Sequence, residues 1–163
     1  MASVDMFLKL DGIDGESQDD KHANEIDLIS FAWGQSRESA PGSSTVGAGS
    51  GTGKVSFQDM TITFLTNKGS PKLFSAAAGG KHLSSAIITV RKAGDKPQDY
   101  LIITLSDVVV SSHHISGGTG GATTETATLN FAKIEFSYSP QKGDGSLDAA
   151  VKGNYNIQKN KAE

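Results

Sequence analysis

The adjacent histidines at positions 113 and 114 are the first candidates for metal or acid–base chemistry. Neighbouring side chains in a strand point to opposite faces, so His113 and His114 cannot both ligate one ion. The chain has no cysteine, and the other two histidines, His22 and His82, are distant in sequence. We therefore expect no metal site, no bound cofactor, no disulfide and no thiolate nucleophile.

The sequence matches none of three further kinds of catalytic or phosphate site. No serine has the Gly-x-Ser-x-Gly context of a nucleophile elbow. Gly53 and Lys54 resemble the end of a phosphate loop, but Ala48 occupies the first glycine position and Val55 replaces the hydroxyl residue. The acidic pairs at 14/16 and 19/20 lie in turn-rich stretches, where a charged turn is expected rather than a catalytic dyad. The chain is therefore not expected to be an enzyme.

Composition excludes further function classes. The 163 residues are 36% hydrophobic and 20% charged, with a net charge of −3 and no basic stripe, so nucleic acid is not an expected partner. No apolar stretch approaches the roughly 20 residues that span a bilayer, so membrane insertion is not expected. Residues 1–10 lack the basic lead and apolar run of a signal peptide. We expect synthesis in the cytoplasm and export, if any, by a route that reads no leader.

The elements that must position any site are mainly strands in one domain over residues 1–163. Period-2 alternation predicts strands at 4–10, 26–37, 54–65, 82–92, 100–111 and 125–139, with an extended piece near 154–158. The apolar phase slips by one residue within 54–65 and again within 129–138, as at β-bulges, which favours a barrel over a flat sandwich. In residues 26–37, one face carries Ile29, Phe31 and Trp33.

One helix is predicted, over residues 70–79. Ser70 is expected to cap its first amides and Pro71 suits the first turn. Leu73, Phe74 and Ala77 are expected on one side, and Gly79 or Gly80 ends the helix.

Two segments indicate contacts beyond the single chain. Residues 100–111 are apolar in both phases, so the helix or a neighbouring subunit must cover the outer face, and the interface candidates are Ile102, Ile103, Val108 and Val110. Residues 40–53 form a Gly/Ser/Thr-rich loop, which is either a flexible excursion or an interaction loop.

The order and spacing of many short segments resemble the Hcp (hemolysin-coregulated protein) family, the tail tube proteins of bacterial type VI secretion, across nearly the whole chain. The segments are VDMFLK at 4–9, GES at 15–17, His22, EIDLISFAWG at 25–34, GKVSFQD at 53–59, SPKL at 70–73, GKH at 80–82, ITVRKAG at 88–94, YLIITL at 100–105, LNFA at 129–132 and YSPQK at 138–142.

The resemblance implies a mainly β fold in which two curved antiparallel sheets close into a barrel with one short helix. It also implies hexameric rings that stack into a tube, are expelled from the cell with the sheath and spike as partners, and hold effector proteins in the lumen. By the same resemblance, Leu28, Ser30 and Ala32 would face the lumen, with Ala32 where the family has a small hydroxyl side chain. The long loop would contact the next ring through Pro41, Gly42, Ser43, Ser44, Thr45 and Val46.

Two other function classes remain open. A secreted β-sandwich that binds a ligand such as a sugar would show clustered aromatics with acidic residues on one face, whereas Trp33, the one tryptophan, is expected in the core. A toxin enzyme would need an added catalytic domain, for which we expect no room after the last strand.

Overall fold

The computed structural model describes residues 3–37 and 53–163 and contains ten strands and one helix in that part of the chain. The elements are β1 (Val4–Leu10), β2 (Ile26–Ala32), β3 (Gln35–Arg37), β4 (Val55–Phe57), β5 (Met60–Leu65), α1 (Ser70–Gly79), β6 (His82–Lys92), β7 (Gln98–Ser116), β8 (Thr124–Tyr138), β9 (Val151–Asn156) and β10 (Lys161–Ala162).

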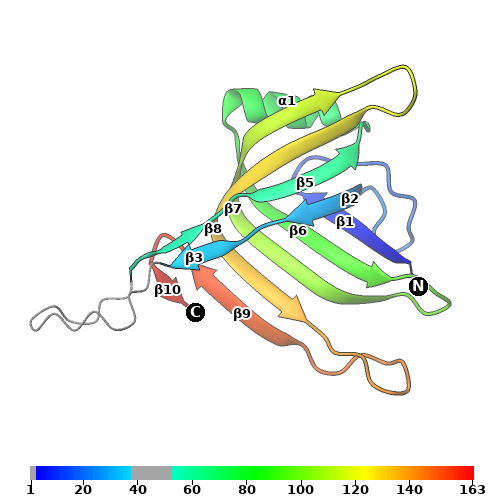
Figure 1. The fold of residues 1–163 in the computed structure, drawn as a ribbon, viewed down its shortest axis with the longest axis vertical. Coiled ribbons are helices and arrows are strands. Elements are labelled where there is room, and N and C mark those ends of the chain that lie inside the picture. The colour runs from blue at the N-terminus through cyan, green and yellow to red at the C-terminus, as the bar shows by residue number, and fades with distance from the viewer. Residues whose placement is uncertain (1–2, 38–52) are drawn as a thin grey trace, which may run out of the picture.

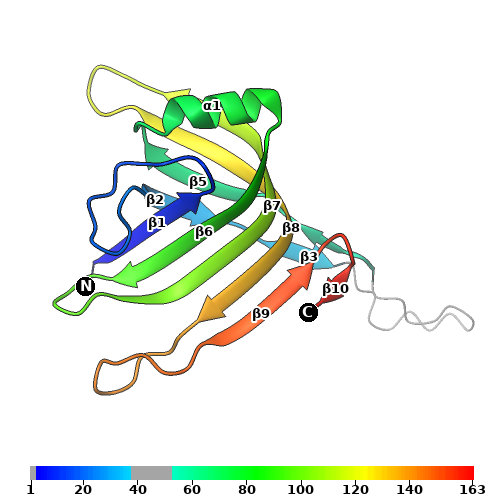
Figure 2. The same ribbon diagram turned by 180° about the vertical axis from the view of Figure 1, so that it is seen from behind.

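Six of these strands close into a β-barrel, as predicted. The order is β8-β5-β2-β1-β6-β7, and β7 pairs with β8 to complete the circuit, with every ladder antiparallel. Closure leaves no free edge within the six-stranded ring, which protects it from edge-to-edge aggregation. In Figures 1 and 2, α1 lies across one end of the barrel, and β9 lies at the opposite end.

The sheet forks at β8, which is long enough to pair with three strands. Its residues 124–129 pair with β5, and its residues 133–138 pair with β9 along the same edge. The hairpin of β3 and β4 forms a separate two-stranded sheet. The predicted strands 26–37 and 54–65 are therefore each divided in two, because the chain leaves the barrel sheet between β2 and β3 and re-enters it between β4 and β5.

Bulges set which side chains reach the core. Register shifts occur at Leu28/Ser30, Val90/Arg91 and Val110/Ser112. The first shift places Leu28 in the core and leaves Ile29 54% exposed. The predicted slip within 54–65 coincides with the break between β4 and β5. In β8, every second residue from Glu125 to Phe131 is buried, and the next buried apolar residue is Ile134. The alternation therefore shifts by one residue within this strand.

The helix has the predicted bounds but not the predicted contacts at its start. Gly80, with φ 63° and ψ 33°, takes the left-handed conformation that ends it. Leu73 and Ala76 are buried, whereas Phe74 is 60% exposed. Ser70 does not cap the first turn, because its hydroxyl donates to the Glu125 carboxylate and accepts from the Asn67 amide. The bond from Ser70 to Glu125 ties α1 to β8 of the barrel.

The strand predicted to be apolar on both faces, now β7, is buried on one face only. Ile103, Val108 and Val110 lie in the core of the same chain, where no other subunit can reach them. Ile102, the fourth interface candidate, is half-buried and points outward. The physical reason is barrel closure, which turns one face of β7 wholly inward.

Within the described residues, α1 is too short to cross a bilayer, and no other helix qualifies as a candidate span.

Candidate functional site

The two adjacent histidines point to opposite faces of β7, as predicted. His114 is exposed, whereas the His113 side chain is buried and its Nε2 lies 2.5 Å from Oε1 of Glu125. Glu125 is itself inaccessible and accepts a second hydrogen bond from Ser70. No group of three or more possible His, Asp or Glu metal ligands converges in the described ranges 3–37 and 53–163.

The Ser70–Glu125–His113 network has the residue types of a catalytic triad in the wrong order. Glu125 stands between the other two, so His113 does not contact the Ser70 hydroxyl and cannot take its proton. Burial alone would raise the pKa of Glu125, but the hydrogen bonds from Ser70 and His113 outweigh it and hold that pKa below its usual value. The arrangement is suited to holding α1 against β7 and β8.

A second charged cluster fastens the loop that joins β1 to β2. Arg91 is almost fully buried and makes a two-pronged ion pair with Asp19, which lowers the pKa of that carboxyl well below its usual range. The guanidinium also lies 5.0 Å from the Phe7 ring, and Phe7 stacks on His22 at 4.4 Å. In the charged turn predicted at residues 19 and 20, Asp19 is thus bound to Arg91 of β6.

His22 completes this cluster. Its Nδ1 lies 2.6 Å from Glu25, and its Nε2 lies 3.1 Å from Asp99 at the start of β7. Sequence reasoning named His22 as a family residue but missed this pairing, because Asp99 is 77 residues away.

The outer face of β2, β5, β8 and β7 forms a hydroxyl-rich surface. Pairing aligns two rows across the strands, Ala32–Thr61–Thr128–Ser112 and Ser30–Thr63–Thr126–His114. These rows contain no Lys, Arg, Asp or Glu. We call the eight residues the hydroxyl-rich face. Ser30 and Ala32 belong to it, whereas Leu28, predicted beside them, is turned into the core by the bulge.

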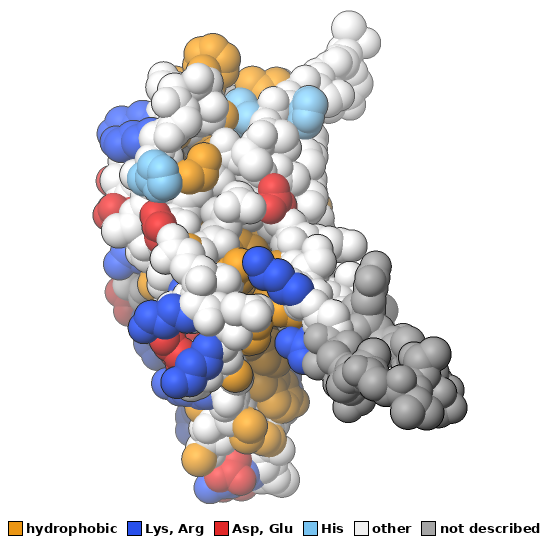
Figure 3. Space-filling view, turned by 90° about the vertical axis from the view of Figure 1, so that its left-hand side faces the viewer, with side chains coloured by type: hydrophobic (Ala, Val, Ile, Leu, Met, Phe, Trp, Pro, Cys, Tyr) orange, Lys and Arg blue, Asp and Glu red, His pale blue; other side chains and the backbone are white. Residues whose placement is uncertain are grey.

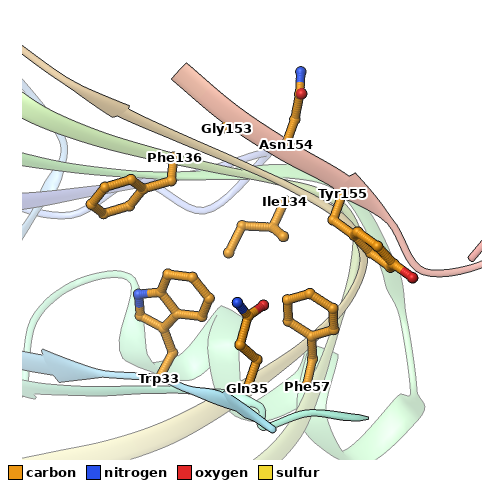
Figure 4. Close-up of a pocket in the computed structure, with 8 residues that line it drawn as sticks. All are labelled: Trp33, Gln35, Phe57, Ile134, Phe136, Gly153, Asn154 and Tyr155. Atoms are coloured by element: carbon orange, nitrogen blue, oxygen red, sulfur yellow. The ribbon is translucent and has the colours of Figure 1, made fainter. Parts of the chain in front are cut away.

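An open aromatic cleft lies where β3 and β4 face β8 and β9. It has a volume of about 390 Å³ and is lined by Trp33, Gln35, Phe57, Ile134, Phe136, Gly153, Asn154 and Tyr155. In Figure 4, Trp33, Gln35 and Phe57 face Phe136, Ile134 and Tyr155 across the gap. We call these eight residues the aromatic cleft. Trp33 was expected in the core, but it follows β2 and is only partly buried.

Apolar side chains are also visible on the outside of the molecule near this cleft. Figure 3 views the side that carries β3 and β10 and shows apolar side chains gathered in the lower half of that face, with Lys and Arg side chains beside them. The predicted ring-contact loop, Pro41 to Val46, lies outside the described residues.

Comparison with known proteins gives a consistent result over nearly the whole chain. The family model for "Type VI secretion system effector, Hcp" matches residues 7–138. Protein hcp1 of Pseudomonas aeruginosa is 46% identical over 162 residues, which are 97% of this chain and 98% of that protein.

Solved structures agree. A type six secretion system protein, 33% identical, superposes with a TM-score of 0.90 and covers 99% of this chain and 100% of its own. Hcp1 from Salmonella typhimurium, 34% identical, has a TM-score of 0.79 over 100% of both chains.

Proposed function

Because the chain belongs to the Hcp family of type VI secretion system proteins, we propose that it is a subunit of the inner tube of that system. Six copies would form a closed ring, and rings would stack into a tube that is expelled with the help of the sheath and spike. The observation that carries the proposal is the aromatic cleft, which leaves large apolar side chains uncovered in a single chain. Exposed apolar surface beside a finished core is typical of an assembly contact.

The hydroxyl-rich face supports a role as the lumen wall. Apart from His114, its rows present short side chains without a formal charge on four adjacent strands, which would let cargo bind through scattered hydrogen bonds. Ser30 and Ala32 stay among the proposed effector contacts, and exposed Ile29 replaces Leu28. Ala32 offers no hydroxyl, so the cargo at that position would be held by apolar contact.

Electron microscopy of negatively stained protein, combined with native mass measurement, tests the ring directly. We expect discs with a central hole and a mass of six chains. A monomer at micromolar concentration would contradict the proposal.

Cargo binding needs a separate experiment on intact rings. Two arginines on the hydroxyl-rich face, Thr63→Arg with Thr126→Arg, should reduce the effector protein that co-purifies with rings. Gln18→Arg adds a charge to the exposed loop between β1 and β2 and should leave the cargo unchanged. Equal cargo in all three proteins would contradict a lumen role for this face.

We also propose that the chain has no catalytic activity of its own, since the Ser70 hydroxyl is bonded to the buried Glu125 carboxylate and His113 does not contact it. Purified protein should hydrolyse none of a panel of ester, peptide, glycan and phosphate substrates. Activity that disappears in His113→Ala or His114→Ala would contradict this.

The aromatic cleft also gives some support to the ligand-binding alternative. Four aromatic side chains and the Gln35 amide line it, but no carboxylate does, although a sugar site would commonly have one. Retention of the isolated protein on a glycan array, lost in Trp33→Ala, would favour that function over the tube.

A further inference from the structure

The His22 ring lies between two carboxylates that belong to different parts of the chain. Its Nδ1 lies 2.6 Å from Oε2 of Glu25, three residues further along the same loop. Its Nε2 lies 3.1 Å from Oδ2 of Asp99, which is 77 residues away at the start of β7. The His22 side chain is only 8% exposed, so water does little to screen either contact. The contact with Asp99 ties this end of the loop to β7.

The number of protons on the His22 ring decides whether both contacts are attractive. An ionised carboxylate only accepts hydrogen bonds, so with Glu25 and Asp99 both ionised each ring nitrogen must donate. The imidazolium form does this, whereas a neutral imidazole has one N–H and turns a lone pair towards the second carboxylate. Loss of one proton therefore exchanges one attraction for one repulsion.

The two contacts are unequal, which determines the one that is lost. The contact with Glu25 is the shorter, and it joins residues only three apart, so keeping it costs little chain entropy. The contact with Asp99 is longer, at 3.1 Å and 3.2 Å to its two oxygens, and the Asp99 side chain is 30% exposed. The remaining proton should therefore stay on Nδ1, and Nε2 should present its lone pair to Asp99. Deprotonation then separates the loop from β7.

The charged groups around this ring are mainly carboxylates. Phe7 of β1 stacks on the His22 ring at 4.4 Å, and the Arg91 guanidinium of β6 lies 5.0 Å from the same Phe7 ring. The surrounding carboxylates come from the loop, β1, β2 and β7, and they are Asp19, Glu25, Asp5, Asp27 and Asp99. Exposed Lys9 and Lys21 form no ion pair with them in the part of the chain that the structure describes. Loss of the imidazolium charge would therefore increase the repulsion among these carboxylates.

We propose that His22 is a proton-operated latch, which bonds residues 20–25 to β7 as imidazolium and releases them as neutral imidazole. The first part of the loop stays in place, because Asp19 remains ionised and paired with Arg91. The pKa of the Asp19 carboxyl lies well below its usual range, so this ion pair persists wherever a histidine titrates. Release would uncover the Phe7 ring, which is 3% exposed beneath His22. The latch belongs to the single chain and does not depend on ring assembly.

Hydrogen exchange of the parent protein tests the latch, with protection expressed relative to the intrinsic exchange rate at each pH. Between about pH 5.5 and about pH 8.5, a range in which histidine titrates, protection of the amides of residues 20–25 should fall. The fall should be about tenfold or more, as expected when one charge-assisted hydrogen bond is lost. Protection of the amides of β8 should stay constant over the same range. Constant protection of residues 20–25 would overturn the proposal.

Asp99→Asn distinguishes the latch from a pH effect of another origin. The new side-chain amide can donate to an unprotonated Nε2 while Nδ1 still donates to Glu25, so a neutral His22 ring keeps both contacts. At low pH the same side chain can accept from Nε2 through its oxygen. Protection of residues 20–25 should therefore stay near the low-pH level of the parent throughout. A fall as large as that of the parent would overturn the latch.

The matched control is Asp27→Asn, the same chemical change at a carboxylate on the strand that pairs with Phe7. This variant should keep the fall in protection seen in the parent, because Asp27 does not bond to His22. His82→Gln removes an exposed histidine–carboxylate pair, that of His82 with Asp107, and should also behave like the parent. Loss of the pH dependence in Asp27→Asn would overturn the assignment to Asp99.

Nitrogen-15 spectra of protein labelled at histidine provide a second test that does not depend on how Asp99→Asn folds. The chain has four histidines, and the signals missing from His22→Gln are those of His22. We expect both ring nitrogens of His22 to be protonated at about pH 5.5 and Nδ1 alone at about pH 8.5. A neutral His22 ring at the lower pH, in protein whose residues 20–25 are protected, would overturn the latch.

Discussion

At the scale of single residues, the buried guanidinium of Arg91 organises a cluster of carboxylates. Asp19 binds it directly, and Asp5 lies 3.7 Å away. Burial, together with the charges of Asp5 and Asp19, raises the pKa of nearby Asp27. The loop between β1 and β2 is therefore held on the barrel by one cation that several carboxylates share.

Asp19→Asn should lower the free energy of unfolding by about 2 kcal/mol at neutral pH, since a charge-assisted hydrogen bond is lost. The folded-state pKa of Asp19 lies below the unfolded value of about 3.9. Its stabilisation is therefore complete above the unfolded pKa and is lost as pH falls towards the folded pKa. Urea titrations at several pH values should show the difference between parent and variant shrinking below about pH 4.

Asp20→Asn is the matched control for this prediction, because Asp20 is adjacent and exposed. It should change stability by less than about 0.5 kcal/mol at any of these pH values. A difference for Asp19→Asn that does not depend on pH would argue against the ion pair as its cause.

The sequence indicated that residues 19 and 20 form a charged turn, but it could not show what the turn binds. Asp19 meets Arg91 across 72 residues, and His22 meets Asp99 across 77. Local spacing carries no information on such pairs, since they depend on how the closed sheet folds back on itself. The opposite orientations of His113 and His114, in contrast, followed from strand geometry alone.

At the scale of elements, the bulge in β2 decides which of two neighbouring apolar residues stabilises the barrel. Leu28→Ala should lower the free energy of unfolding by about 2–5 kcal/mol, because Leu28 packs in the core. Ile29→Ala should change it by less than about 0.5 kcal/mol, because Ile29 is exposed in the single chain. Denaturation of dilute, monomeric protein measures both. Equal losses would show that β2 has no bulge there.

The attachment of α1 depends on the buried Ser70–Glu125–His113 network. His113→Leu should cost about 3 kcal/mol, because it leaves the inaccessible Glu125 carboxylate without its basic partner. Replacing both residues, His113→Leu with Glu125→Leu, should cost less than the sum of the single changes, because no buried charge is left unpaired. A double-mutant cycle measured by urea denaturation gives the coupling energy. Strict additivity would contradict a direct pair.

Element bounds were largely predictable, whereas side-chain directions were not. Alternation and helix-ending glycines placed β1, β6 and α1 at the residues where the structure has them. The face assignments failed at Leu28 and at Phe74. Period-2 alternation says that neighbours point apart, but a bulge reverses which of them points inward, and the bulge depends on the partner strand. Three of the four interface candidates on β7 failed because an apolar pattern does not distinguish a core from a subunit contact.

At the scale of the whole molecule, the barrel is closed, but large apolar side chains remain exposed on its outside. The six-stranded barrel buries its core together with Leu73 and Ala76 of α1. In contrast, β9 and the β3–β4 hairpin extend beyond the barrel and line the aromatic cleft. The family resemblance predicted the barrel, and the resemblance alone implied rings. The structure adds exposed apolar side chains on α1, at Phe74, and on β8 and β9, at Phe136, Tyr138 and Val151. A group of such side chains is typical of a contact with another protein.

If Phe74 and α1 take part in ring assembly, that assembly must contribute to the apparent stability of each chain. The melting temperature of the parent should then rise with protein concentration, because association of folded chains shifts the equilibrium between folded and unfolded protein towards the folded state. Phe74→Ser should remove that dependence and lower the melting temperature at high concentration by several degrees, since about 1 kcal/mol shifts it by about 2–4 °C in a chain of this size. Ile29→Ser, at a side chain that is 54% exposed on β2, should melt like the parent at every concentration. Scanning calorimetry over a hundredfold range of concentration separates the two variants, and parallel behaviour of Phe74→Ser and the parent would mean that α1 does not take part in assembly.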